Sequence, residues 1–286
     1  MTTTKLSNPT TKHDLCVYEW NDTFNDEATK PEKLVCIFHG AGGRGLQFEK
    51  TCEILAKNHP DWHFVTFDQV GHGGSFSSDI SYQWSDFEFD SLYSNAEFIV
   101  NHFRNKYQQK DHKIELCIAA HSVGSGLAMR YCINHRDIVS KLILLGTKPE
   151  APGKSPVWVF PSLFLELIRG VFSASFAKLA YHESTPIEVK EAESEHTKNN
   201  TMYMMKAICT QLIWPTQEEI ATIKVKTLVI SGETDGLTQP ERGKVVHELI
   251  ENSQFCIIEG ASHNMMIEKP SILAEKIEQF FIANEQ

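Results

Sequence analysis

The chain has 286 residues, 41% of them hydrophobic and 22% charged, which is typical of a globular protein with one large core or one core plus an insertion. A formal net charge of −10 disfavours nucleic acid as a partner, because its phosphates would be repelled. The polar N-terminus and the lack of an apolar run of about 20 residues predict neither a secretory signal nor a membrane span.

Short apolar strands and amphipathic helices alternate along most of the chain. Residues 1–12 are predicted to form a loose tail, and residues 21–32 a hydrophilic hairpin loop that follows an edge strand. The predicted strands are 13–20, 33–39, 63–68, 114–120, 139–146, 227–231 and 254–258. The predicted helices are 48–57, 87–107, 124–134, 240–249 and 271–282. The alternation predicts an α/β fold with a mostly parallel, doubly wound sheet covered by helices on both faces.

Residues 149–215 interrupt this alternation. The segment has no buried strand, several prolines and the apolar stretch VWVFPSLFLELI, and helical runs follow around 176–181, 187–198 and 202–213. We expect a helical cap inserted after the sixth core strand, with the core formed by residues 1–148 and 216–286. The alternative is a helical elaboration packed on the side of the fold.

The seven cysteines are an odd number, widely scattered, and form no C-x-x-C pair. They are Cys16, Cys36, Cys52, Cys117, Cys132, Cys209 and Cys256. Several fall in predicted strands and helices, as small buried hydrophobic residues do. A reducing, cytoplasmic setting is the simplest interpretation.

The sequence AHSVG places Ser122 between a predicted buried strand and a predicted helix. A serine at the tip of such a turn needs a strained positive φ, which is tolerated when the residues two before and two after it are small. Ala120 and Gly124 satisfy this condition. The pattern resembles the G-x-S-x-G nucleophile elbow of the α/β-hydrolase family, with alanine in place of the first glycine. A serine- and glycine-rich helix start is the alternative.

A serine nucleophile needs an orienting carboxylate, and Asp235 in SGETDG is the candidate. It follows a β-branched strand and precedes the helix predicted from Pro240, and the ends of parallel strands are where such a sheet collects functional groups. Glu233 and Glu150 also follow strands and remain alternatives. The alternative without a catalytic role is that Asp235 only shapes the turn before Gly236.

His263 in GASHNMMIEKP is the candidate base. It lies between the last predicted strand and the last helix, which places it over the same sheet edge as Ser122 and Asp235. The order Ser, Asp, His along the chain is the order found in α/β-hydrolases. The pattern G-x-x-H-x-x-x-x-E-x-P also resembles the histidine loop of that family.

Two glycine-containing turns complete the predicted site. In HGAGG (39–43), Ala41 is expected to offer one backbone N–H to an oxyanion, with Gly42 as the alternative, and Val123 to offer the second. His39 is expected to hold this loop. The turn DQVGHGGS resembles a family motif in which Asp68 holds a sharp bend.

The resemblance extends over residues 30–283 and includes the four ordered motifs and the position of the cap. It is to the abhydrolase-domain proteins of the α/β-hydrolase fold family. The stretch TMYMMKAICTQLIWP (201–215) is nearest to the abhydrolase-domain-eight type. The resemblance implies a serine hydrolase without cofactor or metal, acting on a small-molecule acyl ester. Trp158 and Phe164 are then expected to line an apolar acyl pocket under the cap.

Alternatives to ester hydrolysis remain open at this stage. His59 and His63 are four residues apart, but Pro60 lies between them and no H-E-x-x-H metal motif is formed. His63 and Asp68 match an acyltransferase pattern, yet they lie along a predicted buried strand, so hydrolysis is favoured. A thioesterase or acyltransferase of the same family, or a non-catalytic interaction protein that retains the fold, are the competing hypotheses.

Overall fold

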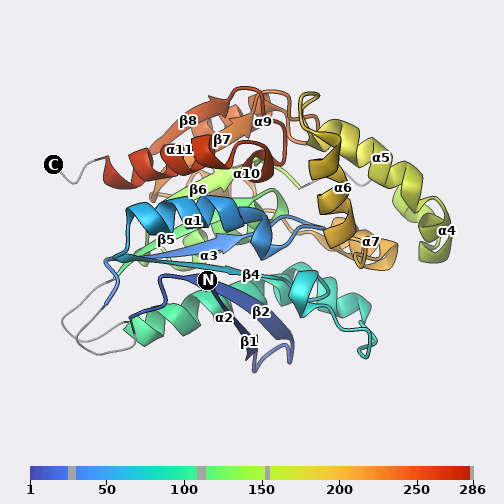
Figure 1. Cartoon of the computed structure of the whole chain (residues 1–286), viewed down its shortest axis with the longest axis horizontal. Helices are drawn as coiled ribbons and strands as arrows, with labels where there is room; N and C mark the ends of the chain where they lie inside the picture. The colour runs from blue at the N-terminus through green and yellow to red at the C-terminus, as the bar shows by residue number, and fades with distance from the viewer. Residues whose placement is uncertain (25–29, 108–113, 152–154, 284–286) are drawn as a thin grey trace.

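A computed structural model of the chain describes residues 1–24, 30–107, 114–151 and 155–283. An eight-stranded sheet crosses the molecule in the order β1-β2-β4-β3-β5-β6-β7-β8 (Figure 1). The pairs β1–β2 and β2–β4 are antiparallel, and all the other pairs are parallel. The predicted mostly parallel α/β fold is confirmed.

The strand bounds follow the buried runs of the sequence closely. They are β1 (Thr2–Ser7), β2 (Asp14–Trp20), β3 (Lys33–Phe38), β4 (Trp62–Phe67), β5 (Glu115–His121), β6 (Val139–Leu145), β7 (Lys226–Gly232) and β8 (Ser253–Ile258). Every residue of β3 and β4 is buried, as expected for strands covered on both faces. Part of the predicted loop at 21–32, residues 25–29, lies outside the described residues.

The prediction of a loose tail at residues 1–12 was wrong. Residues Thr2–Ser7 form β1, which pairs antiparallel with β2 and makes β1 the edge strand instead of β2. Most side chains of β1 remain exposed, so the strand carries almost no hydrophobic signal. Its three consecutive threonines favour extended backbone, which is the local reason it can pair.

The helices cover both faces of the sheet. Those outside residues 149–215 are α1 (Glu49–Asn58), α2 (Phe89–Tyr107), α3 (Val123–Asn134), α8 (Gln217–Ile220), α9 (Pro240–Leu249), α10 (Met265–Glu268) and α11 (Pro270–Ile282). One core cluster joins the sheet to α2, α3 and α9, and a second joins it to α1 and α11. The helical periodicity of the sequence predicted the bounds of the five longer helices, α1, α2, α3, α9 and α11, to within a few residues.

Residues 149–215 form helices and no strand in their described part. They are η4 (Pro156–Val159), α4 (Ser162–Leu167), α5 (Arg169–Ala180), α6 (Ile187–His196) and α7 (Met202–Gln211). These helices lie together at one end of the molecule, beside the loops that follow the parallel strands (Figure 1). Among the described residues, no helix combines the length and apolar character needed to cross a membrane.

Candidate active site

Ser122 occupies a strained turn between β5 and α3. Its φ of 51° and ψ of −120° lie outside the regions that side chains other than glycine usually adopt. Close packing surrounds the turn: a Cβ at Gly124 would lie 2.6 Å from the His39 carbonyl oxygen, and one at Gly40 would lie 2.9 Å from the Ser122 Cβ. The structure therefore has the backbone geometry of a nucleophile elbow.

His263 and Asp235 form a buried hydrogen-bonded pair. His263 Nδ1 donates to Asp235 Oδ2 at 2.8 Å, and both side chains are at most 4% exposed. Because Nδ1 carries the proton in this arrangement, Nε2 is left free to accept one. The two residues come from the loops after β8 and β7, as the sequence predicted.

The Asp235 carboxylate also accepts hydrogen bonds from its own loop. The N–H groups of Leu237 and Thr238 donate to Oδ1 at 2.9 and 2.8 Å, and the Thr238 hydroxyl lies 2.7 Å from Oδ2. Burial alone would raise the pKa of Asp235, but the hydrogen bond and charge of His263, with the Thr238 donors, outweigh it and lower the pKa. The carboxylate is thus held ionised against the imidazole.

The other two acids considered from the sequence lie elsewhere. Glu233 is exposed and accepts from the Gly260 N–H at 2.8 Å, while Glu150 pairs with Arg242 on the surface. Neither has a recorded contact with His263 in the described chain. The geometry thus favours Asp235 as the orienting acid.

His263 lies beside the serine turn. The Ser122 N–H donates to the Leu145 carbonyl at 2.9 Å, and a Cβ added to the next residue, Gly146, would lie 3.1 Å from Cε1 of His263. On the other side, His121 Nε2 donates to the His263 carbonyl oxygen at 3.0 Å. The structure therefore brings the predicted nucleophile, base and acid to the same edge of the sheet.

Thr238 and His121 were not singled out from the sequence. The Thr238 hydroxyl lies within hydrogen-bond distance of the Asp235 carboxylate and of the Gly146 carbonyl, the latter at 3.0 Å. Its oxygen is also 3.1 Å from Nδ1 of His263. Burial, followed by the neighbouring His263 charge, holds the pKa of His121 well below its ordinary value, so it is neutral. The D-x-x-T spacing could have indicated Thr238, because the N–H and hydroxyl of a threonine three residues after an aspartate can donate hydrogen bonds to its carboxylate.

Two backbone N–H groups near Ser122 are free for an oxyanion. Within the described part of the chain, no protein acceptor is recorded for the N–H of Ala41 or of Val123. The N–H of Gly42, the alternative to Ala41, already donates to His72 Nε2 at 3.1 Å. This difference favours Ala41 as the first donor and leaves the prediction for Val123 unchanged.

Two buried histidines hold the glycine loop against the following turn. His39 donates from Nδ1 to the Gly40 carbonyl at 2.7 Å and accepts from the Gln69 N–H at 2.9 Å. His72 donates from Nδ1 to the Val70 carbonyl at 3.0 Å and accepts from Gly42. Asp68, predicted to hold the bend, accepts from the N–H groups of Gly45 and Gly74 and from the Tyr18 hydroxyl.

These histidines should make the protein sensitive to mild acid. Burial lowers the pKa of His39 to about 4 and, with the charge of His39, that of His72 to about 3, both from 6.5. Between pH 6.5 and these values the unfolded chain binds protons that the folded chain does not, so stability falls as pH falls. Each histidine contributes about 1.4 kcal/mol per pH unit, and His121 acts in the same direction. Burial raises the pKa of Asp68, which opposes them in the lower part of the range.

The measurement is the urea midpoint of unfolding at about pH 7 and about pH 5. We expect a clearly lower midpoint at about pH 5. An equal or higher midpoint there would show that these histidines are not held neutral in the folded protein.

The 149–215 segment is hydrogen-bonded to the loops that carry the acid and the histidine. The Leu179 carbonyl accepts from the Gly236 N–H and the Ser262 hydroxyl, both at 3.0 Å. The Glu268 carboxylate accepts from the N–H groups of His182 at 2.6 Å and Ser262 at 2.7 Å. The glutamate of the predicted histidine-loop motif therefore joins this segment to the residue next to His263.

The same segment also contacts the glycine loop. Asn200 donates to the Gly42 carbonyl at 2.6 Å, and Glu193 pairs with Arg44 at 2.7 Å. The segment thus contacts the glycine loop as well as the loops that carry Asp235 and His263, and its role as a cap stays a prediction.

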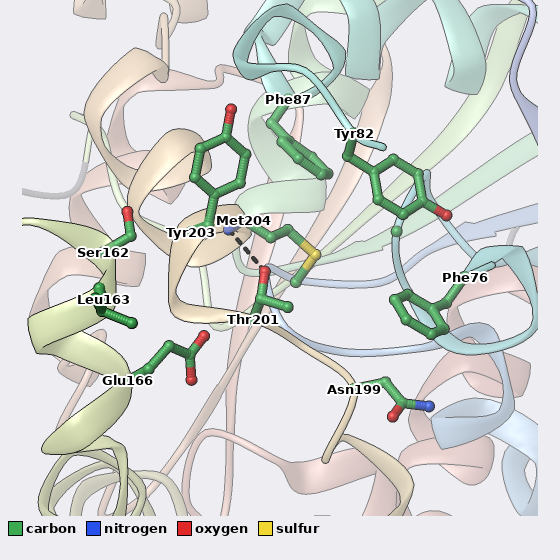
Figure 2. A pocket seen from close by; sticks show the side chains of 11 residues that line it. Phe76, Tyr82, Phe87, Ser162, Leu163, Glu166, Asn199, Thr201, Tyr203 and Met204 are labelled. Carbon is green, nitrogen blue, oxygen red and sulfur yellow. Dashed lines mark hydrogen bonds between the residues drawn. The ribbon is translucent and has the colours of Figure 1, made fainter. Parts of the chain in front are cut away.

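A pocket with a volume of about 370 Å³ lies between this segment and the loop at 71–87 (Figure 2). Its lining residues are Gly71, Phe76, Tyr82, Phe87, Ser162, Leu163, Glu166, Asn199, Thr201, Tyr203 and Met204. Trp158 and Phe164, predicted from the sequence to line an acyl pocket, are not among them. Trp158 stacks on Phe172, and the Phe164 ring packs against Phe160.

The pocket is close to the glycine loop. Gly71 lines it, and the adjacent His72 binds the Gly42 N–H. Met204 lines it as well, and a Cβ at Gly42 would lie 3.2 Å from Sδ of the adjacent Met205. Among the described residues, no three histidine, cysteine, aspartate or glutamate side chains are grouped so that they could hold a metal ion.

Comparison with known proteins places these features in a family. A family model described as "Serine aminopeptidase, S33" matches residues 29–270. The chain is 23% identical to proline iminopeptidase PfmaB of Pestalotiopsis fici, over 85% of this chain and 90% of that protein. It is 20% identical to Protein ABHD8 of Mus musculus over 90% of this chain, and the match spans 56% of that longer protein.

Solved structures support the fold. An esterase from Exiguobacterium antarcticum superposes with a TM-score of 0.78 at 17% identity, with 98% of this chain and 99% of that one covered. An enol-lactonase from Burkholderia xenovorans gives 0.77 at 15% identity, with 97% and 99% covered. At these identities the likeness concerns the fold alone. The predicted membership of the abhydrolase-domain proteins is confirmed by the family match and the ABHD8 relatives.

Proposed function

This chain belongs to the serine aminopeptidase S33 family of α/β-hydrolases, and from that premise we propose that it hydrolyses carboxylic esters through an acyl-enzyme on Ser122. Asp235 and His263 complete the triad, and the N–H groups of Ala41 and Val123 form the oxyanion hole. The substrate is a small molecule with an apolar acyl group. The family match supports hydrolase activity, and the ester bond and the residues are our proposal.

In the acylation step, the Ser122 hydroxyl oxygen attacks the ester carbonyl carbon while His263 Nε2 takes its proton. Asp235 keeps the Nδ1 proton in place and stabilises the imidazolium that forms. The negative charge on the carbonyl oxygen is received by the two free N–H groups. The tetrahedral intermediate then collapses, and the leaving alcohol departs with the proton from His263.

Deacylation reverses these roles with water. His263 removes a proton from water, the resulting hydroxide attacks the acyl-serine carbonyl, and Ser122 leaves with the proton returned by His263. The observation that carries the proposal is the buried Asp235–His263 hydrogen bond of 2.8 Å. His263 is in turn hydrogen-bonded through its carbonyl oxygen to His121, the residue before a serine at positive φ. A binding protein that retained only the fold would not need to keep this costly pair or this strained serine.

The pocket beside the glycine loop predicts a preference for longer acyl groups. Each methylene buried contributes about 0.8 kcal/mol, equivalent to at most a fourfold gain in kcat/KM. We expect kcat/KM to rise from acetyl to medium-chain p-nitrophenyl esters, and polar acyl groups to be poor substrates because their desolvation is not compensated. The measurement is a chain-length series on the unmodified protein.

Two phenylalanine variants locate the acyl group. Phe76→Ala, which removes a lining ring, should flatten the series, whereas Phe164→Ala, outside the pocket, should leave its slope unchanged. The reverse result would assign the acyl group to Phe164, as the sequence suggested. A series that is flat in the unmodified protein would show that this pocket does not bind the acyl group.

A further inference from the structure

The segment between β6 and β7 presents an unusual amount of apolar surface to solvent. Leu163, Leu167 and Val171, one helical turn apart along α4 and α5, are 79%, 80% and 69% exposed. Together with neighbouring exposed residues they form what we call the outer apolar surface, consisting of Val159, Phe160, Leu163, Phe164, Leu167 and Val171. Single exposed apolar residues are normal, but a contiguous group along one helix pair marks an interaction site.

Charge is almost absent from this surface. Among the exposed residues from 155 to 179, Lys178 is the one that carries a charge. Glu166 and Arg169 are half-buried, and they lie 3.5 Å apart as an ion pair. Exposed acidic residues of the segment gather on α6 instead, where Glu188, Glu191 and Glu195 are exposed, and Glu183 is exposed just before it. In a chain with net charge −10, this surface therefore has no exposed carboxylate between residues 155 and 179.

The position of the surface suits a broad, flat partner. Figure 1 shows α4 and α5 along the outer end of the molecule, away from the sheet. Aromatic rings accompany the aliphatic residues: Trp158 stacks on Phe172, and Phe160 packs against Phe164. Aliphatic residues close to tryptophan and phenylalanine rings are also common in helices that lie in a membrane interface.

The apolar pocket reaches this surface. Leu163 belongs to both, and Figure 2 shows Leu163 and Glu166 of α4 on one side of the pocket, opposite Phe76 and Tyr82. An apolar chain leaving a lipid layer beside Leu163 would meet the mostly apolar lining directly. A second copy of this protein would have no comparable use for an open pocket at its interface.

We propose that the outer apolar surface of η4, α4 and α5 docks onto a zwitterionic lipid surface. The surface enters the boundary between headgroups and acyl chains, while the acidic α6 stays in water. A zwitterionic surface is favoured because an anionic one would repel a chain of net charge −10. Docking itself does not depend on hydrolysis.

The test measures binding to phosphatidylcholine vesicles by flotation, using the Ser122→Ala variant so that binding is read without turnover. Leu163→Asp and Leu167→Asp should each weaken binding by about tenfold or more, since each removes one large apolar side chain that docking would take out of water and places a charge at the lipid boundary. Ile272→Asp, on α11 and 39% exposed, is the matched control and should bind as the parent does. Leu167→Met should also retain binding.

Several results would overturn the proposal. They are no flotation of the parent protein, equal binding by all variants, or binding only to vesicles containing phosphatidylserine. A dimer in light scattering that Leu167→Asp converts to monomer, with no vesicle binding, would assign the surface to a second copy. Loss of ester hydrolysis in other experiments would leave this result unaffected, so the two proposals fail separately.

Discussion

Replacing Ser122 with alanine is expected to lower kcat for ester hydrolysis by a factor of about 10⁴–10⁶, and His263→Ala by a similar factor. The reason is that attack and proton transfer form one step, so removal of either partner removes the whole acyl-enzyme route. The residual rate would come from substrate binding and the oxyanion N–H groups. The measurement is the steady-state rate with a p-nitrophenyl ester.

The double variant distinguishes this account from general damage to the site. Because the residues act as a unit, Ser122→Ala combined with His263→Ala should be no slower than either single variant. Ser175→Ala, at an exposed position of α5, is the control and should keep full activity. If the two losses multiplied, the residues would be acting independently and the proposed shared step would be wrong.

The second large effect is expected at the acid. Asp235→Asn should lower kcat by about 10³–10⁴, since an amide offers no negative charge to the imidazolium and can favour the wrong tautomer of His263. Glu233→Gln is the matched variant two residues away, with its side chain bonded to Gly260 rather than to the histidine. It should change kcat by less than about threefold, as is usual for an exposed residue outside the site.

The pair of acid variants is compared at several pH values. Asp235→Asn should be the slower variant at each pH, because the amide removes the negative charge that faces the imidazolium formed during catalysis. If Glu233→Gln were the slow variant and Asp235→Asn the fast one, the acid would have been assigned to the wrong residue, despite the 2.8 Å contact.

The core of the fold was predictable because its strands are buried on both faces. Continuous apolar runs such as Lys33–Phe38 and Trp62–Phe67 have few other interpretations when they alternate with helical patterns along the chain. The strand Thr2–Ser7 was missed because its side chains are mostly exposed and its pairing depends on backbone bonds to β2. Hydrophobic periodicity depends on burial, so it does not predict a strand whose side chains stay exposed at the edge of a sheet.

The candidate site was predictable where close packing constrains the backbone. Small residues around Ser122 and glycines after β3 are visible in the sequence because a side chain there would collide with neighbouring atoms. The placement of Asp235 against His263 followed from the order of the strands. Thr238 and His121 were not foreseen, because their roles depend on contacts between separate loops.

The pocket was the least predictable part. The apolar stretch around Trp158 and Phe164 could form a lining, a packing interface or an exposed surface, and a one-dimensional pattern does not distinguish these. In the structure, Leu163 and Glu166 of that stretch line the described pocket, while Phe164 is 43% exposed. A role of Trp158 and Phe164 in substrate binding therefore stays a hypothesis from the sequence, and the chain-length series with Phe164→Ala tests it for the phenylalanine.

The central claim, that Ser122 is an activated nucleophile, is tested most directly by a fluorophosphonate probe followed by peptide mass spectrometry. The probe reacts with a serine whose proton is removed by a neighbouring base, so we expect a single covalent adduct on the peptide containing Ser122. The adduct should be absent from Ser122→Ala and nearly absent from His263→Ala. A folded protein that remains unlabelled, or an adduct on a different serine that persists in Ser122→Ala, would contradict the account.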